Sequence, residues 1–215
     1  MIRVELNLED KGQWVKVFDP RDFTVHLDGD ATAGVGDTVR IDLSVGNEGP
    51  RVILRGQVIA HRDVAEGSAP AGTTVALGAE EREKVNYLNG FVRGGLLNLR
   101  ERRRLPLRLE VTYGGVNGPC KSYTRDINEE GIFVVTEDPL PEESELHLLV
   151  AFPGQEKSTS LVGVVTHTVV VEDEDVPGMG IVFSLDDASR AELIARVDEL
   201  EKKFLKSELP EEALL

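Results

Sequence analysis

The sequence predicts a mainly β protein built from two small antiparallel β-barrels, each followed by an α-helix. The first observation is a set of short runs that are rich in β-branched residues and bounded by glycine, proline or aspartate, as strands commonly are. The second is that these runs recur after a fixed interval, and the third is a charged, helical segment after the last run of each half. The clearest runs are residues 37–43, 52–59, 146–152 and 161–167.

The two halves of the chain carry these runs in the same order. Sliding the sequence against itself by about 107 residues places Val39 on Leu146 and Gly56 on Gly163. A further adjustment of one residue places 72–77 on 178–183. A long period with matched gaps indicates duplicated domains, because solenoid repeats are much shorter.

Helical segments are expected to close both halves, at residues 80–94 and 186–206. In the second segment an apolar stripe recurs at spacings of four, three and four residues, and it consists of Leu193, Val197, Leu200 and Phe204. Such a stripe is typical of a helix that buries one face. We expect it to cover its own barrel; the alternative is a helix contact between two protomers, and hence a homodimer.

The predicted domain boundary lies between the first helix and the second half. The pair Gly94 and Gly95 ends the helical pattern in the way that a C-terminal cap does. The predicted domains are therefore residues 1–97 and 98–215.

Composition narrows the classes of protein to consider. The chain has 215 residues, of which 40% are hydrophobic, so either domain can bury a core. No window approaches the roughly 18 apolar residues of a membrane helix, and the first residues do not resemble a secretory signal. A single cysteine, Cys120, excludes an internal disulfide and a cysteine-based metal cluster. We therefore expect a cytoplasmic protein that is not inserted in a membrane.

A basic cluster stands out against an acidic background. The net charge of −15 argues against binding to a nucleic-acid polymer, which needs many cations. Five arginines nevertheless fall within nine residues, opposed only by Glu101, and they are Arg100, Arg102, Arg103, Arg104 and Arg108. This segment is either a solvated linker or an anion site, since the arginine fork matches phosphate oxygens and stacks on flat rings.

Catalytic and metal chemistry has little support in the sequence. The four histidines are scattered over predicted strands without metal-ligand spacing, and they are His26, His61, His147 and His167. The acidic run 172–175 lacks the spaced oxygens and central glycine of a calcium loop, which favours a solvated hairpin. No nucleophile motif and no glycine-rich phosphate loop is present. We expect neither an enzyme nor a bound metal or cofactor.

The second half resembles the PilZ family. The resemblance rests on the order of four features: the arginine cluster, a strand at 105–112, a turn at 126–131, and a glycine-bounded strand at 178–183 before the last helix. The ligand signature of that family is RxxxR before the first strand, followed by [D/N]xSxxG. Arg100 and Arg104 meet the first element. Arg104 and Arg108 also have the right spacing, but Arg108 would lie within the strand, so we prefer the first register.

The second signature element is met by Asp126 and Gly131, with Asn128 where the family has serine. The resemblance implies that cyclic di-GMP (c-di-GMP) is bound by Arg100, Arg103, Arg104, Asp126, Asn128 and Gly131. Arginine suits this ligand because it binds phosphate, pairs with guanine O6 and N7, and stacks on the base. Asp126 would accept from the guanine N1–H and N2–H, and Gly131 would allow a tight turn or a close backbone approach.

The first half lacks this signature, since Arg21 and Thr24 fall where the second half has Asn128 and Gly131. It is expected to be a degenerate PilZ-like barrel. The resemblance implies a bacterial c-di-GMP receptor that signals to an effector protein through a change in domain arrangement. The alternative is an adaptor in motility or surface attachment that binds no nucleotide and acts through protein contacts. Asn128 is the residue that separates the two hypotheses.

Overall fold

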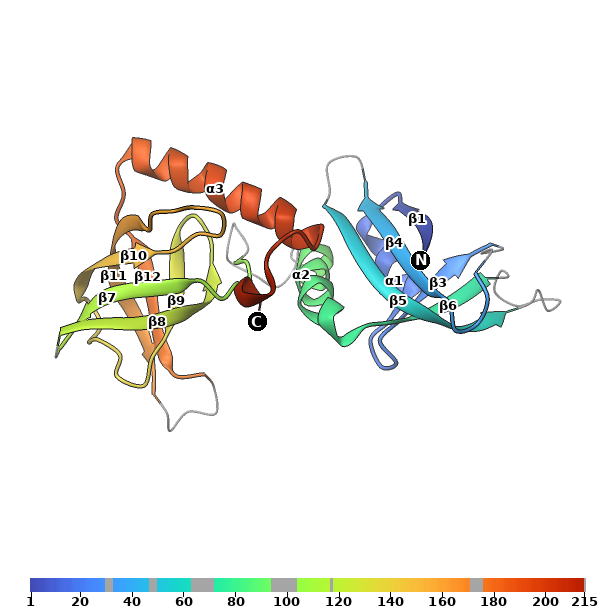
Figure 1. The fold of residues 1–215 in the computed structure, drawn as a ribbon, viewed down its shortest axis with the longest axis horizontal. Coiled ribbons are helices and arrows are strands. Elements are labelled where there is room, and N and C mark those ends of the chain that lie inside the picture. Colours follow the sequence, from blue (N-terminus) through green and yellow to red (C-terminus); the bar gives the residue numbers. More distant parts are fainter. Residues whose placement is uncertain are drawn as a thin grey trace. The chain divides into compact units, whose positions relative to one another are not determined.

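The computed structural model describes residues 1–29, 33–46, 50–62, 72–93, 104–116, 118–170 and 176–214. The chain divides into two compact units, each with a sheet of its own (Figure 1). The first unit comprises Met1–Leu99 together with Phe204–Ser207, and the second comprises Arg100–Lys203 together with Glu208–Leu215. The predicted mainly β fold is confirmed.

The first unit is a six-stranded sheet with two helices. Its elements are β1 (Ile2–Leu8), α1 (Lys11–Val17), β2 (Phe18–Asp19), β3 (Thr24–Asp28), β4 (Thr38–Val45), β5 (Arg51–Arg62), β6 (Gly72–Leu77), a 3-10 turn at Ala79–Glu81 and α2 (Arg82–Arg93). The strand order is β1-β4-β5-β6-β3-β2. β1 pairs with β4 in parallel, which the prediction of an antiparallel barrel did not include. A parallel pair needs a long connection, and here α1, β2 and β3 lie between the two strands in sequence.

The second unit is a closed barrel followed by a long helix (Figure 1). Its elements are β7 (Glu110–Gly115), β8 (Gly118–Ile127), β9 (Gly131–Val135), β10 (Glu145–Val150), β11 (Thr159–Val169), β12 (Gly178–Phe183), α3 (Asp187–Leu205) and a 3-10 turn at Glu211–Ala213. All of its strand pairs are antiparallel. Alternating residues such as Val111, Leu148 and Ile181 have no exposed surface and fill the barrel, as the predicted strand periodicity requires.

The sequence repeat corresponds to a shared irregularity in the two sheets. The register of β5 against β6 shifts between Val58 and Ala60. The register of β11 against β12 shifts between Val165 and His167, at the same offset as the repeat. Such a bulge bends a strand and increases its twist, so both sheets curve at equivalent places.

The repeated glycines, Gly56 and Gly163, meet the same steric constraint. A Cβ on Gly56 would lie 2.7 Å from a methyl of Val75, and one on Gly163 would lie 2.5 Å from a methyl of Ile181. Both distances are well inside van der Waals contact. The repeat therefore preserves the positions at which the neighbouring strand leaves no room for a side chain.

The helices that close both halves occur where the sequence predicts them, as α2 and α3. All four residues of the α3 stripe are buried, with exposures between 1% and 6%. Arg196 on α3 donates to Thr159 Oγ1 of the same unit at 3.2 Å, in agreement with a helix that covers its own barrel over this part. The last stripe residue, Phe204, belongs instead to the first unit, where its ring centroid lies 6.0 Å from that of Tyr87. No helix in the described ranges has the length and apolar character needed to cross a membrane.

Helix α1 was not expected from the sequence. Asp10 caps it, because its Oδ1 accepts from the backbone N–H of Gly12 at 2.6 Å and of Gln13 at 3.1 Å. Its buried Trp14 stacks on Phe18, with ring centroids 4.8 Å apart. The helix has only seven residues, which is too short for a periodic pattern to stand out.

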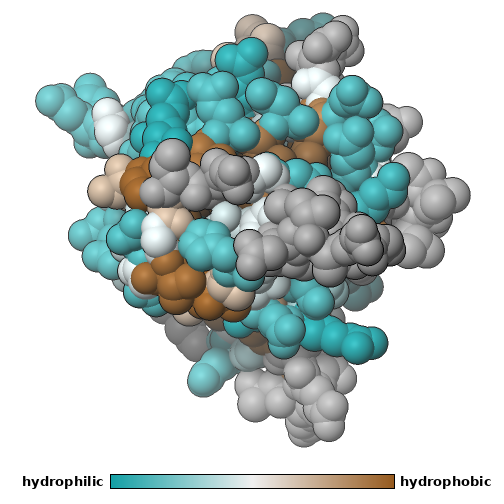
Figure 2. Space-filling model, turned by 90° about the vertical axis from the view of Figure 1, so that its right-hand side faces the viewer, coloured by the Kyte–Doolittle hydropathy of each residue, from teal (hydrophilic) through white to brown (hydrophobic). Residues whose placement is uncertain are grey.

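The surface of the first unit carries both polar and apolar side chains. Figure 2 shows polar side chains over most of the visible face, with apolar side chains gathered between them. The exposed large apolar residues of the described part of this unit include Val15, Val35 and Ile59. The four histidines all lie in strands, as expected: His26 in β3, His61 in β5, His147 in β10 and His167 in β11.

We expect Gly56→Ala and Gly163→Ala each to lower the free energy of unfolding by about 1–3 kcal/mol, because the added methyl group overpacks a strand pair. Urea unfolding followed by circular dichroism measures the effect. Gly114→Ala is the matched control, since a Cβ at Gly114 in β7 meets nothing within 4 Å. A Gly163→Ala variant as stable as Gly114→Ala would contradict this account of the repeat.

Candidate functional site

The end of the arginine cluster is fixed beside the end of strand β8. Leu105 exchanges two backbone hydrogen bonds with Ile127, at 2.7 and 3.0 Å. This bridge places Arg104 next to Asp126, and Arg104 Nη1 donates to Asp126 Oδ1 at 2.8 Å. The two side chains are only 15% and 17% exposed. The structure therefore brings together one residue from each element of the signature.

A bulge in β8 adds a second arginine to Asp126. The register of β8 against β9 shifts between Thr124 and Asp126, which leaves Arg125 as the extra residue. Arg125 Nε donates to Asp126 Oδ2 at 3.3 Å, and its guanidinium lies 3.8 Å from the centroid of the Phe133 ring. Asp126 thus binds one arginine with each oxygen, and Arg125 is further held by a cation–π contact.

Phe133 lies in a row of residues on adjacent strands. It pairs with Gly180 of β12, which pairs in turn with His167 of β11. The Phe133 and His167 rings are 6.0 Å apart at 40°. A Cβ at Gly178 would lie 2.5 Å from the Phe133 ring, and one at Gly180 would clash with the His167 imidazole. The glycines of β12 therefore leave room for both rings.

Asn128 shapes the loop between β8 and β9. Its Oδ1 accepts from the backbone N–H of Glu130 at 3.0 Å and of Gly131 at 2.8 Å. Its own N–H donates to the Gly131 carbonyl at 2.9 Å, and the residue is 2% exposed. The amide oxygen is therefore engaged by the turn that it closes. Direct contact between Asn128 and a ligand stays a prediction.

Gly131 allows β9 and β12 to approach each other closely. It begins β9 in extended conformation and pairs with Val182 of β12. A Cβ at this position would clash with the carbonyl oxygen of Ile181. Of the two roles that the sequence allowed for this glycine, the structure supports the close backbone approach.

Three predicted features remain untested by the geometry. Arg100, Arg103 and the acidic run 172–175 lie outside the described residues. Arg108, the alternative partner in the signature, lies over the Tyr123 ring with its guanidinium carbon 3.7 Å from the centroid.

Two arginines of the described cluster, Arg104 and Arg125, share the carboxylate of Asp126. The Nε of Arg104 is buried and forms no hydrogen bond within the described residues. A buried donor without a partner costs about 1–3 kcal/mol, which an anionic or carbonyl oxygen of a ligand would recover. The same part of the chain contains no group of three or more side chains arranged to bind a metal ion.

The sequence interpretation missed Arg125, Phe133 and His167. Arg125 follows Thr124 in a strand that looked regular, and only the bulge turns it toward Asp126. Phe133 and His167 lie in different strands, so their contact depends on sheet register. The glycines at 178 and 180 were the one available signal, because alternate glycines leave space on one face of a sheet.

Comparison with known proteins gives a family match for the second part of the chain. Residues 98–199 match the family model described as PilZ domain. This segment is therefore similar to PilZ domains. No curated protein matches the sequence significantly.

Several solved structures are similar to the chain. The Bacillus subtilis inhibitor of motility, MotI/DgrA, has 13% identity over 85% of this chain and 86% of its own, with a TM-score of 0.41. YcgR of Escherichia coli, solved in complex with c-di-GMP, has 12% identity over 85% and 76%, with a TM-score of 0.40. MrkH of K. pneumonia, also solved with c-di-GMP, has 12% identity over 84% and 76%, with a TM-score of 0.37. All three TM-scores lie below 0.5, so these likenesses are remote.

We expect Asn128→Ala to lower the free energy of unfolding by about 1–3 kcal/mol, because two loop N–H groups lose their acceptor. Thermal or urea unfolding of the full chain measures this. Asn128→Ser keeps a side-chain oxygen that can accept from the turn and should lose less. Equal losses in both variants would show that the amide oxygen does not stabilise the loop.

Proposed function

We propose that the chain is a c-di-GMP receptor. The ligand would be held by the arginine cluster at residues 100–108, which we also call the arginine linker, and by the β8–β9 loop, both within residues 98–215. The observation that supports this most directly is the 2.8 Å bond between Arg104 and Asp126, which joins the two elements of the signature within a PilZ domain. The domain limits of 1–97 and 98–215 are part of the proposal. A PilZ domain points to a receptor or adaptor and not to an enzyme.

The chemistry of the cluster fits a ligand with two guanines and two phosphates. Each oxygen of Asp126 has a lone pair beyond the one used by its arginine, and these would accept from guanine N1–H and N2–H. The free Nε of Arg104 would donate to a phosphate or to guanine O6. The flat guanidinium of Arg125, already supported by Phe133, offers a surface on which a purine can stack.

The second candidate function is an adaptor that binds no nucleotide. Asn128 favours it, because the family signature has serine at this position. Within our proposal, the asparagine oxygen maintains the loop that a serine hydroxyl would otherwise support. Either function includes a protein partner, and we propose a bacterial effector protein as the recipient of the signal.

Calorimetric titration of the full chain with c-di-GMP should give saturable binding, with GTP and cyclic AMP much weaker. Arg104→Ala should weaken binding by roughly 10- to 100-fold, because charge-assisted hydrogen bonds contribute about 1.5–3 kcal/mol. Arg21→Ala is the matched control, since Arg21 is an exposed arginine of the first unit.

Circular dichroism must show that Arg104→Ala retains the fold, and Arg104→Lys supplies a second variant that keeps the charge but loses the fork. Absence of heat and of thermal stabilisation at millimolar c-di-GMP would favour the adaptor. Equal affinities of Arg104→Ala and Arg21→Ala would remove Arg104 from the site.

We further propose that ligand binding orders the linker and thereby changes how the two domains are arranged. Clustered arginines repel one another, and a ligand with two phosphates supplies the missing counter-charge. Spin labels on the two domains should then report a narrower distribution of distances at saturating c-di-GMP. An unchanged distribution of distances would mean that ligand binding does not act through the arrangement of the two domains.

A further inference from the structure

The outer face of the first sheet carries a row of arginines. Arg3 of β1 lies opposite Arg40 of β4, and Arg40 lies opposite Arg55 of β5. Side chains opposite one another in neighbouring strands are only about 5 Å apart at Cβ, where like charges are destabilising. In a chain with a net charge of −15, this concentration of cations needs a compensating interaction.

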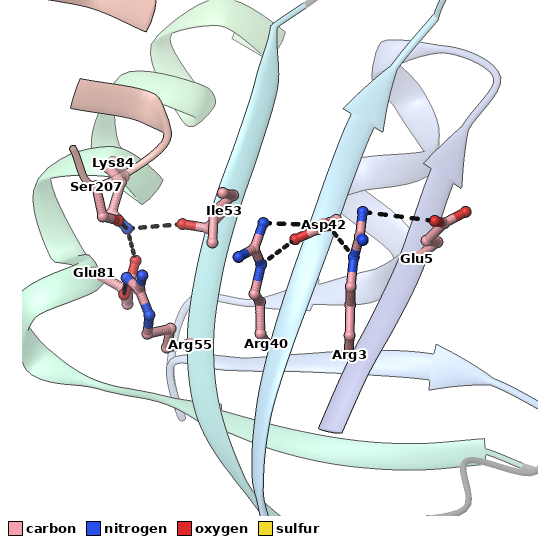
Figure 3. Close-up of polar contacts among 9 residues, drawn as sticks. All are labelled: Arg3, Glu5, Arg40, Asp42, Ile53, Arg55, Glu81, Lys84 and Ser207. Carbon is pink, nitrogen blue, oxygen red and sulfur yellow. Dashed lines mark hydrogen bonds and ion pairs between the residues drawn. The ribbon is translucent and has the colours of Figure 1, made fainter. Parts of the chain in front are cut away.

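One carboxylate is shared by two members of this row. Arg3 and Arg40 each donate through Nε to a different oxygen of Asp42, with the Arg40 bond at 2.6 Å (Figure 3). Burial alone would raise the pKa of Asp42, but hydrogen bonds and attraction from the two arginines outweigh it and hold the pKa below its ordinary value. Asp42 is thus charged at neutral pH, and a second carboxylate, that of Glu5, lies 3.8 Å from Arg3 Nη2 (Figure 3).

The third arginine of the row, Arg55, also shares a carboxylate with another cation. Arg55 Nη1 lies 3.7 Å from Glu81, which also pairs with Lys84. Lys84 is buried and donates at 2.7 Å to the Ile53 carbonyl and at 2.7 Å to Ser207 Oγ (Figure 3). Burial lowers the pKa of Lys84 although Glu81 favours its charged form. Glu81 therefore already pairs with the buried Lys84, and little of its negative charge is left for Arg55.

A pocket of about 390 Å³ opens on this face. Four cations and two carboxylates line it, so cations are in excess: Arg3, Arg40, Arg51, Lys206, Glu5 and Asp42. Asn7 and Ser44 add polar groups, and Ser44 lies opposite Arg51 in the sheet. The ion pairs recorded among the described residues do not include Arg51. Ile53 adds an apolar wall. The volume falls in the range of small-molecule sites, and the lining offers guanidinium and amide donors to an anion.

We propose that this pocket is a binding site for a small anionic molecule, with a phosphate or carboxylate group held by Arg3, Arg40 and Arg51. The anion would supply the negative charge that Asp42 and Glu5 provide only in part. The side-chain amide of Asn7, whose Oδ1 accepts from Ser44 Oγ at 2.6 Å, would donate its N–H groups to the anion, and Ile53 would contact an adjoining apolar group. The site lies in the first unit, and it is independent of the c-di-GMP site proposed in the second.

The test is a titration of the isotope-labelled full chain, followed by amide NMR shifts at constant ionic strength. Inorganic phosphate and citrate are added separately, so that the two arms distinguish a phosphate from a carboxylate ligand. At least one should cause saturable shifts in β1, β4 and β5. Arg51→Ala should weaken this binding about tenfold, since it removes a charge-assisted hydrogen bond.

Two controls separate a site from general electrostatic attraction. Arg21→Ala removes an exposed arginine that does not line the pocket, and it should leave the affinity unchanged. Arg51→Ala should retain the affinity of the second unit for c-di-GMP, so failure of one proposal is distinguishable from failure of the other. The proposal is overturned by the lack of saturable shifts on these strands with both probes, or by equal effects of the two variants.

Discussion

A carboxylate shared between two arginines is the interaction on which the candidate site depends. Asp126 holds Arg104 with one oxygen and Arg125 with the other, in surroundings that leave these side chains only partly exposed. Desolvating such a cluster is costly unless each charge is hydrogen-bonded. The hydrogen bonds from the two arginines to Asp126 offset part of this cost and hold both guanidinium groups in place.

The first unit uses the same arrangement in a different place. Asp42 is shared by Arg3 and Arg40 on the face of a sheet, as Asp126 is shared by Arg104 and Arg125 at the end of a strand. The arginines around Asp42 come from β1 and β4, whereas Arg104 lies before the first strand of the barrel. The two units therefore build this arrangement from different parts of their folds.

Steric constraints between strands determine where these charged groups can lie. Gly131 and Gly180 let neighbouring strands and the His167 ring approach without a clash. The bulge at Arg125 brings an arginine that would otherwise alternate away from Asp126 onto the same side. Closure of the barrel therefore demands a few glycines and bulges, and the candidate site forms around them.

The sequence by itself determined the strand-like runs, the two closing helices, the repeat and, through the resemblance, the choice of Arg104 and Asp126 as candidate ligand-binding residues; their direct hydrogen bond was decided by the tertiary structure. These features follow from local periodicity and from spacing along the chain, which each segment carries alone. Tertiary structure decided that β1 runs parallel to β4, that Arg125 and Phe133 join the cluster, and that the oxygen of Asn128 closes a buried loop. The first two depend on strand pairing and register, and a shift of one residue reverses which face a side chain occupies, so the spacing within one strand does not specify its partner in the next. The loop at Asn128 is local, but only the structure shows that its side-chain oxygen accepts from the loop.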